Sequence, residues 1–181
     1  YIGAYGGVIK LLGRAKKMDN GKIFAMVSPA IVKNGSQLAS VSDVFNAILV
    51  RGNATGDVVF YGKGAGKLPT ASAVVADIID CAKHTARRKA FGWGKAAENY
   101  VIDPVLQSTS LYVCAEAENY ITAFNEINKQ FDSPVILHRE NADKNEIAFI
   151  TPVMREKEAR AVIEQLPINV KTILRVLEGF A

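Results

Sequence analysis

The stretch Tyr61–Asp77, which joins a glycine-rich turn to a helix, constrains the fold of this chain more than any other segment. Gly62, Gly64 and Gly66 alternate there, so the backbone can adopt positive φ and lie close against another surface. Pro69 lacks the amide that a first helical turn leaves unpaired, which predicts a helix beginning near that residue. The apolar residues that follow recur at helical spacing and form one stripe: Ala71, Val74, Val75, Ile78, Ile79 and Ala82.

This glycine turn is open to several interpretations. A flexible turn that enters a helix N-terminus offers free amides and a positive dipole end, which suit an anion or the polar edge of a cofactor. A tight turn before a buried helix explains the glycines equally well. A nucleotide P-loop is excluded, because Tyr61 replaces its first glycine and Leu68 replaces its magnesium-binding Ser or Thr. The dinucleotide-binding fingerprint is excluded because Lys67 replaces its last Gly or Ala.

The order of residues in this stretch is specific. It reads Tyr-Gly-x-Gly-Ala-Gly-x-x-Pro-Thr-Ala-x-Ala-Val, followed by Asp77-Ile78. This order resembles the signature near the end of the catalytic region of homoserine dehydrogenases. Three upstream segments resemble the same family in the same order: Val8–Gly13, Ser28-Pro29 and Phe45–Val50. The resemblance implies an oxidoreductase that uses NADP or NAD to interconvert L-homoserine and L-aspartate 4-semialdehyde, in threonine and methionine biosynthesis.

The resemblance also assigns roles to residues of the turn. Gly66 matches the family's glycine that lies against the cofactor, and Gly64 with Ala65 shapes the same turn, so all three are candidate cofactor-binding positions. The family's Rossmann domain and its catalytic lysine precede the segment that Val8–Leu12 matches. We therefore expect no catalytic residue here, and we expect the chain to be the C-terminal part of the catalytic region plus a further domain, with the NAD(P)-binding domain lying outside it. On its own, the chain should bind cofactor poorly and turn over no substrate.

Residues 1–86 are expected to form a sheet-plus-helix portion of the catalytic region. Alternating segments separated by turn residues predict two strand pairs: 8–14 with 22–27, around the hairpin signal Asn20-Gly21, and 47–51 with 57–61. Periodicity stops over residues 87–107, where basic residues cluster and Asp103-Pro104 interrupts any regular element, so this segment is expected to be a linker.

Residues 108–181 show a second pattern. Alternation at Leu111, Val113 and Ala115 predicts a strand, and 135–138, 146–151 and 170–177 also have strand character. Two apolar stripes at helical spacing predict helices: Tyr120, Phe124, Ile127 and Phe131, then Ala159, Val162, Ile163 and Leu166. The order βαββαβ is that of the split βαβ, ferredoxin-like fold. The predicted class is therefore α+β, and the second domain resembles the ACT regulatory domain of many bacterial homoserine dehydrogenases.

The turn after the first strand of this domain is the candidate effector site, formed by Glu118, Asn119 and Tyr120. ACT domains that bind amino acids usually carry an acidic residue and a glycine there, whereas this turn has no glycine. Asn119 is expected to be able to take the left-handed conformation instead. Two roles stay open: a sensor of L-threonine or another amino acid, and a dimerisation surface. Strands with open edges pair readily, so we expect a homodimer.

Composition and isolated residues exclude other classes. The chain has 181 residues, 49% of them hydrophobic, and a net charge of +4. No apolar run approaches the roughly 18 residues of a membrane helix and no signal peptide is recognisable, so we expect no membrane partner and a cytoplasmic location. Cys81 and Cys114 are far apart, and His84 and His138 are isolated, so no metal site is expected. Arg87–Lys95 mixes cations and aromatics but is short, so we expect a linker and no nucleic-acid partner.

Overall fold

The computed structural model describes residues 1–86, 92, 94, 95 and 97–177. Contacts divide the chain into two compact units, one formed by Tyr1–Ala39 with Glu98–Ala181 and the other by Ser40–Ala97. This grouping differs from the division expected at 86 and 108, because the N-terminal strands join the sheet of the C-terminal segment. Most of the basic cluster at 87–95 lies outside the described residues.

The C-terminal part of the first unit has the predicted order of elements. These are β6 (Ser108–Glu116), α2 (Tyr120–Gln130), β7 (Val135–Leu137), β8 (Glu146–Ile150), β9 (Met154–Arg155), α3 (Glu156–Gln165) and β10 (Asn169–Leu177). The strands lie in the order β10-β6-β8-β7 and neighbours are antiparallel, which is the split βαβ arrangement. The α+β class is thus confirmed. The two-residue β9, which pairs with the start of β6, was not predicted.

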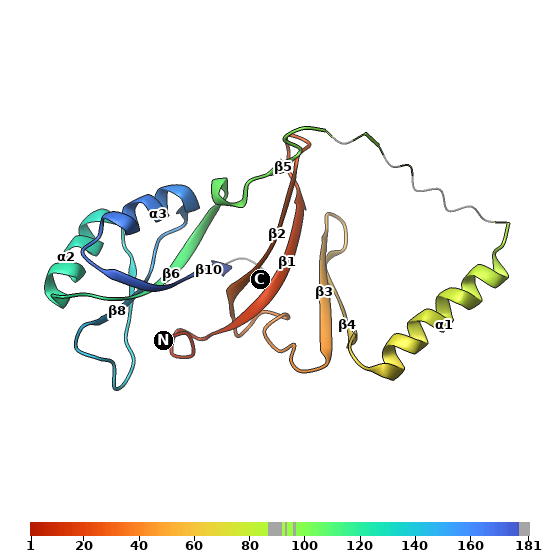
Figure 1. Cartoon of the computed structure of the whole chain (residues 1–181), viewed down its shortest axis with the longest axis horizontal. Helices are drawn as coiled ribbons and strands as arrows, with labels where there is room; N and C mark the ends of the chain where they lie inside the picture. Colours follow the sequence, from red (N-terminus) through yellow and green to blue (C-terminus); the bar gives the residue numbers. More distant parts are fainter. Residues whose placement is uncertain (87–91, 93, 96, 178–181) are drawn as a thin grey trace. The chain divides into compact units, whose positions relative to one another are not determined.

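The main core lies between this sheet and its two helices, which cover one face of it (Figure 1). Alternate residues of β6 point into the core, because successive side chains of a strand face opposite sides. Leu111, Val113, Ile127 and Phe149 are all fully buried there. The helical stripes predicted from sequence supply the rest of the core, so the apolar periodicity that predicts the helices also fixes which face of each helix meets the sheet.

A hairpin of two long strands extends this sheet. β1 (Gly7–Lys17) pairs with β2 (Ile23–Lys33), and the predicted Asn20-Gly21 turn connects them, with Gly21 at φ +78°. β2 then pairs in parallel with β10, through Ala30–Val32 against Arg175–Leu177. The short β5 (Val101–Ile102) pairs with the start of β2, and a 3-10 turn at Pro104–Leu106 follows. These pairings place the N-terminal strands and the βαββαβ part in one sheet.

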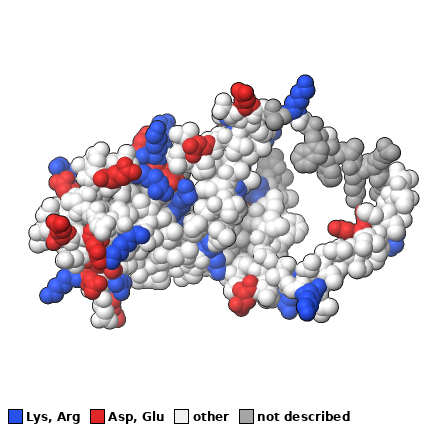
Figure 2. Space-filling model, in the orientation of Figure 1, with Lys and Arg blue, Asp and Glu red and all other residues white. Residues whose placement is uncertain are grey.

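The second unit contains β3 (Phe45–Gly52), β4 (Gly56–Lys63) and α1 (Lys67–Lys83). The two strands form the predicted hairpin, closed by a two-fold contact between Arg51 and Asp57 with N–O distances of 2.6 and 2.7 Å. No residue of α1 is buried within this chain, in contrast to the interpretation of the turn as the start of a buried helix. On the face shown in Figure 2, most of its surface is uncharged. No helix among the described residues is long and apolar enough to cross a membrane.

Candidate functional site

The three predicted cofactor-proximal residues form one turn between β4 and α1. The backbone amides of Gly64 and Ala65 both donate to the carbonyl oxygen of Val44, at 3.2 and 3.5 Å. Gly66 is the N-cap of α1, and its oxygen accepts from the amide of Thr70 at 3.2 Å. Its φ of 116° lies in a region that residues with a side chain rarely adopt. A glycine is therefore required at position 66 by backbone conformation.

Gly64 is constrained for a different reason, which is space: a side chain here would force that of Asn46 to move. A Cβ atom at this position would lie 1.9 Å from the Nδ2 atom of Asn46, in the neighbouring strand β3. At Gly62, by contrast, an added Cβ would meet nothing within 4 Å. The turn thus holds two glycines whose replacement has a local cost and one whose replacement has none, although all three belong to the same sequence pattern.

The turn presents the N-terminal end of α1. The amides of Lys67 and Leu68 have no intrahelical partner, because the first turn of any helix leaves its N–H groups unpaired. The helix dipole and the Lys67 ammonium add positive charge, and Leu68 is 83% exposed beside them. A glycine-lined turn with unpaired amides, a cation and an apolar side chain suits a ligand that carries both an anionic and a flat apolar part.

The candidate effector residues lie at the end of the βαββαβ sheet. A groove of about 980 Å³ runs between the β6–α2 turn, the β7–β8 loop (residues 138–145) and the α3–β10 turn. Glu118 and Asn119 line this groove, together with Asp143 and Lys144. Tyr120 instead lines a neighbouring hollow of about 190 Å³. The structure thus brings two of the three candidates into the groove and turns the third away from it.

The expectation that Asn119 can supply a left-handed backbone in place of glycine is wrong. Asn119 has φ −132° and ψ 109°, an extended conformation. Its side-chain oxygen accepts from the amide of Thr122 at 3.0 Å and so caps α2. An N-cap residue takes extended dihedrals while its side chain turns back to the helix, so capping and a left-handed conformation exclude each other.

The cysteines and histidines form no metal site among the described residues. Cys81 and Cys114 are both free thiols. His84, the C-cap residue of α1, donates a hydrogen bond from Nδ1 to the Asp80 carboxylate, with 2.9 Å between Nδ1 and Oδ1. Within the described part of the chain, no three His, Cys, Asp or Glu side chains are placed to hold a metal ion together. On the face shown in Figure 2, acidic and basic side chains are interspersed over the βαββαβ part.

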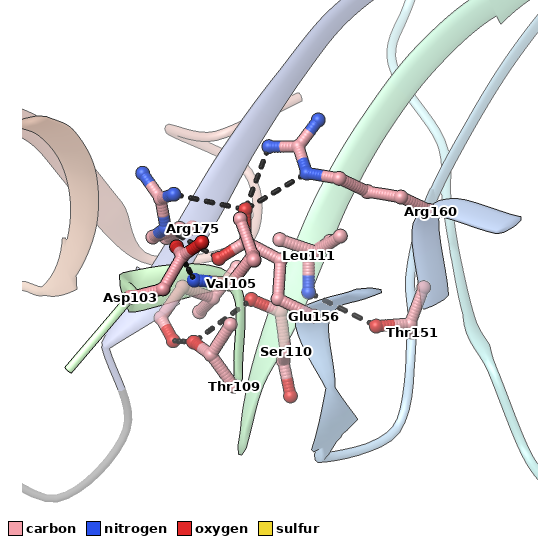
Figure 3. A network of polar contacts seen from close by, with 10 residues as sticks. Asp103, Val105, Thr109, Ser110, Leu111, Thr151, Glu156, Arg160 and Arg175 are labelled. Atoms are coloured by element: carbon pink, nitrogen blue, oxygen red, sulfur yellow. Dashed lines mark hydrogen bonds and ion pairs between the residues drawn. The ribbon is translucent and has the colours of Figure 1, made fainter. Parts of the chain in front are cut away.

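Two polar clusters carried no sequence signal. In one, the buried Glu156 binds Arg160 and Arg175 (Figure 3). In the other, Arg139 forms a two-fold contact with Glu146 at 2.9 and 3.1 Å, and the Tyr1 ring lies 5.3 Å from the Arg139 guanidinium. Burial and a hydrogen bond to Glu146 raise the pKa of Tyr1 to about 12. Glu156 and Arg160 are four residues apart on one helix, a spacing at which opposite charges commonly pair, but the contact of Glu156 with Arg175 depends on how α3 packs against β10.

Comparisons with known proteins agree with one another. The sequence model of the homoserine dehydrogenase family matches residues 1–79, which include the glycine turn. The homoserine dehydrogenase of Corynebacterium glutamicum is 31% identical over 171 residues, which cover 89% of this chain and 38% of that protein. The crystal structure of a homoserine dehydrogenase from Thiobacillus denitrificans aligns with all of this chain and 44% of its own, at a TM-score of 0.76 and 28% identity.

The chain belongs to the homoserine dehydrogenase family. The homoserine dehydrogenase of Synechocystis, 37% identical, matches 68% of this chain and 28% of its own length. The chain thus spans well under half the length of the curated homoserine dehydrogenases that it matches. The structure of the homoserine dehydrogenase from S. aureus covers 98% of this chain at a TM-score of 0.68. The structural similarity to homoserine dehydrogenases therefore extends past residue 79, where the family sequence match ends, and includes the βαββαβ part.

Proposed function

We propose that this chain is part of a homoserine dehydrogenase that interconverts L-homoserine and L-aspartate 4-semialdehyde with NADP or NAD, in threonine and methionine biosynthesis. The observation that carries the proposal is the turn Gly64–Gly66. It lies within the family match, its backbone conformation favours glycine at position 66, and a side chain at position 64 would displace that of Asn46. We assign the turn to the cofactor site and assign no catalytic residue to the chain.

The physical role of such a turn is to let a ligand lie close to the backbone. Glycine leaves the backbone bare, so a planar ring can lie against it, and the unpaired amides at the start of α1 stabilise negative charge nearby. The exposed apolar stripe of α1 indicates that the chain functions as part of a larger protein. Four of its members, Val74, Val75, Ile78 and Ile79, are 47–61% exposed, and contiguous apolar surface of this kind marks an interaction site. The isolated chain should therefore bind cofactor poorly and show no turnover.

The test compares two glycine substitutions in the complete enzyme. Gly66→Ala forces a side chain into the φ region near +116°, whereas Gly62→Ala adds the same methyl group in open space. We expect Gly66→Ala to raise the KM for the cofactor by about tenfold, a loss of about 1.4 kcal/mol of binding, and Gly62→Ala to leave it unchanged. Equal KM values in the two variants would overturn the cofactor assignment. Homoserine-dependent NADP reduction by the isolated chain would overturn the proposal that the catalytic residues lie outside this chain.

A second role is favoured by the groove of about 980 Å³ beside Glu118 and Asn119. We propose that the βαββαβ part is an ACT-like module in a cytoplasmic homodimer and that the groove binds L-threonine or a related amino acid. The acidic side chains suit the ammonium group, and the N-terminal end of α2 suits the carboxylate. The test is the melting temperature with and without L-threonine, recorded with the mass in solution. A ligand that binds only the folded state raises the melting temperature. A dimer whose melting temperature does not change with amino acids would indicate that the βαββαβ part serves dimerisation and not sensing.

A further inference from the structure

Two Asn-Gly pairs occur in the chain, at Asn20-Gly21 and at Asn34-Gly35. Asparagine loses its side-chain amide most readily before glycine, because glycine has no side chain to hinder attack by its own backbone nitrogen on the asparagine Cγ atom. Both pairs lie in turns, and all four residues are exposed. Their hydrogen bonds differ, and this difference predicts which pair reacts.

At Asn20, both groups that would react are held by hydrogen bonds. The amide of Gly21, whose nitrogen would attack, donates to the oxygen of Met18 at 2.9 Å. The side-chain oxygen of Asn20 accepts from the amide of Lys22 at 3.1 Å. A further bond, from the amide of Met18 to the oxygen of Lys22 at 2.9 Å, closes the hairpin of β1 and β2. Reaction at Asn20 therefore requires the end of this hairpin to open.

At Asn34, the reacting groups are not held in this way. The pair directly follows β2, in a turn that is closed by the bond from the amide of Ser36 to the oxygen of Lys33 at 2.9 Å. Within the described part of the chain, neither the Gly35 amide nor the Asn34 side chain has a hydrogen-bond partner. The backbone amide of Asn34 donates to the oxygen of Gly6 at 2.9 Å, which engages neither reacting group. The nucleophile and the carbon that it attacks are thus both available in the folded chain.

We propose that Asn34 is a site of spontaneous deamidation and isoaspartate formation, and that the fold protects Asn20 from the same reaction. The backbone nitrogen of Gly35 forms a bond to Cγ of Asn34, and the bond from Cγ to the side-chain nitrogen breaks. The proton of the attacking amide passes through solvent to the leaving nitrogen, which departs as ammonia. One water then opens the cyclic imide at either carbonyl and gives aspartate or isoaspartate. The reaction requires only water and does not depend on the proposed function.

The modification changes the end of β2. Either product adds a negative charge next to Lys33, and isoaspartate also adds a carbon to the main chain beside the bond from Asn34 to Gly6. Val32, two residues before Asn34, pairs with Leu177 where β2 meets β10. The modified residue therefore lies close to the point where the N-terminal hairpin joins the βαββαβ sheet.

The experiment is incubation of the whole chain without ligand at mildly alkaline pH, once folded and once in urea. Protease digestion and mass spectrometry follow the peptides that contain the two pairs, and methylation by an isoaspartate-specific methyltransferase detects isoaspartate. In the folded chain we expect Asn34 to react at least about fivefold faster than Asn20, because two hydrogen bonds must first break at Asn20. In urea the two rates should be similar, because both turns are unfolded.

Gly35→Ala is the diagnostic variant. The added methyl group would meet nothing within 4 Å, and Gly35 does not have a positive φ, so the fold tolerates alanine there. The methyl group hinders attack on Asn34, so the rate at Asn34 should fall at least about fivefold, to the level of the protected Asn20. Gly62→Ala is the matched control, because it adds the same group in open space away from either asparagine and should leave both rates unchanged.

Three results would overturn the proposal. The first is an Asn20 that reacts as fast as Asn34 in the folded chain. The second is a Gly35→Ala variant that reacts at Asn34 as fast as the wild-type chain. The third is a ratio of the two rates that urea leaves unchanged, since the hydrogen bonds of the folded chain would then not be the cause. None of these results bears on the proposed enzyme function, because no cofactor or amino acid is used.

Discussion

The Glu156 carboxylate accepts a hydrogen bond from the Arg175 guanidinium, with 2.6 Å between Oε2 and Nε, while the Glu156 side chain is 1% exposed (Figure 3). Arg160, one turn along α3, donates to the same carboxylate at 2.8 Å. Glu156 is the first residue of α3, where the helix dipole favours a negative charge. This one carboxylate therefore joins α3 to β10, next to the three-residue segment where β10 pairs with β2.

Glu156→Ala is expected to lower the free energy of unfolding by about 3–5 kcal/mol, because it leaves two guanidinium groups without their buried partner. Glu158→Ala is the control in the same helical turn. Glu158 contacts Arg155 at 3.4 Å, and the two side chains are 57% and 67% exposed, so its loss should cost less than about 1 kcal/mol. Urea denaturation of the two variants measures the difference. Similar midpoints would show that the buried network adds no stability.

Asn119→Ala is expected to cost about 1 kcal/mol, because the cap of α2 is lost, whereas Asn119→Gly should cost only a few tenths. Both substitutions remove the side-chain amide, so loss of a ligand contact would affect them equally. A difference in unfolding free energy between the two variants therefore reports on the cap. Urea denaturation without ligand is the measurement. A glycine variant as unstable as the alanine variant would argue against the cap as the role of this residue.

Gly64→Ala is expected to destabilise the β3–β4–α1 unit by about 1–3 kcal/mol, the usual cost of overpacking. The added methyl group would overlap the Asn46 amide, so the second substitution Asn46→Ala should recover most of the loss. Thermal unfolding of the single and double variants measures the recovery. Gly62→Ala is the matched control in open space. If Asn46→Ala gives no recovery, the requirement for glycine at position 64 has another origin.

Local sequence patterns were sufficient to predict most elements. The Asn20-Gly21 hairpin, the helices that contain Ile127 and Ile163, and the βαββαβ order all follow from periodicities of two or 3.6 residues and from turn chemistry. These signals are local because each element buries one face in a core that its own residues help to build. The glycine turn was also predictable, since its conformation depends on a few adjacent residues.

Long-range features were not predictable in this way. The parallel pairing of Ala30–Val32 with Arg175–Leu177 joins segments about 145 residues apart and involves only three residues on each side. No periodicity distinguishes such a pairing from a free strand edge. The extended backbone of Asn119 was missed for a related reason: its residue type permits both a left-handed turn and an N-cap, and the adjoining helix decides between them.

The contribution of Tyr1 to stability is expected to depend on pH. The folded state raises its pKa from 10.0 to about 12, through burial and the hydrogen bond to Glu146, so folding favours the neutral phenol. This contribution is complete below pH 10 and is lost as the pH rises from about 10 to about 12, because the unfolded chain ionises first. The gap in unfolding free energy between the wild-type chain and Tyr1→Phe should therefore stay constant below pH 10 and shift against the wild-type chain as the pH rises towards 12. Urea denaturation across this range measures the gap, with Tyr100→Phe as the control for loss of an exposed phenol. A gap that stays constant up to pH 12 would contradict the burial that raises the pKa of Tyr1.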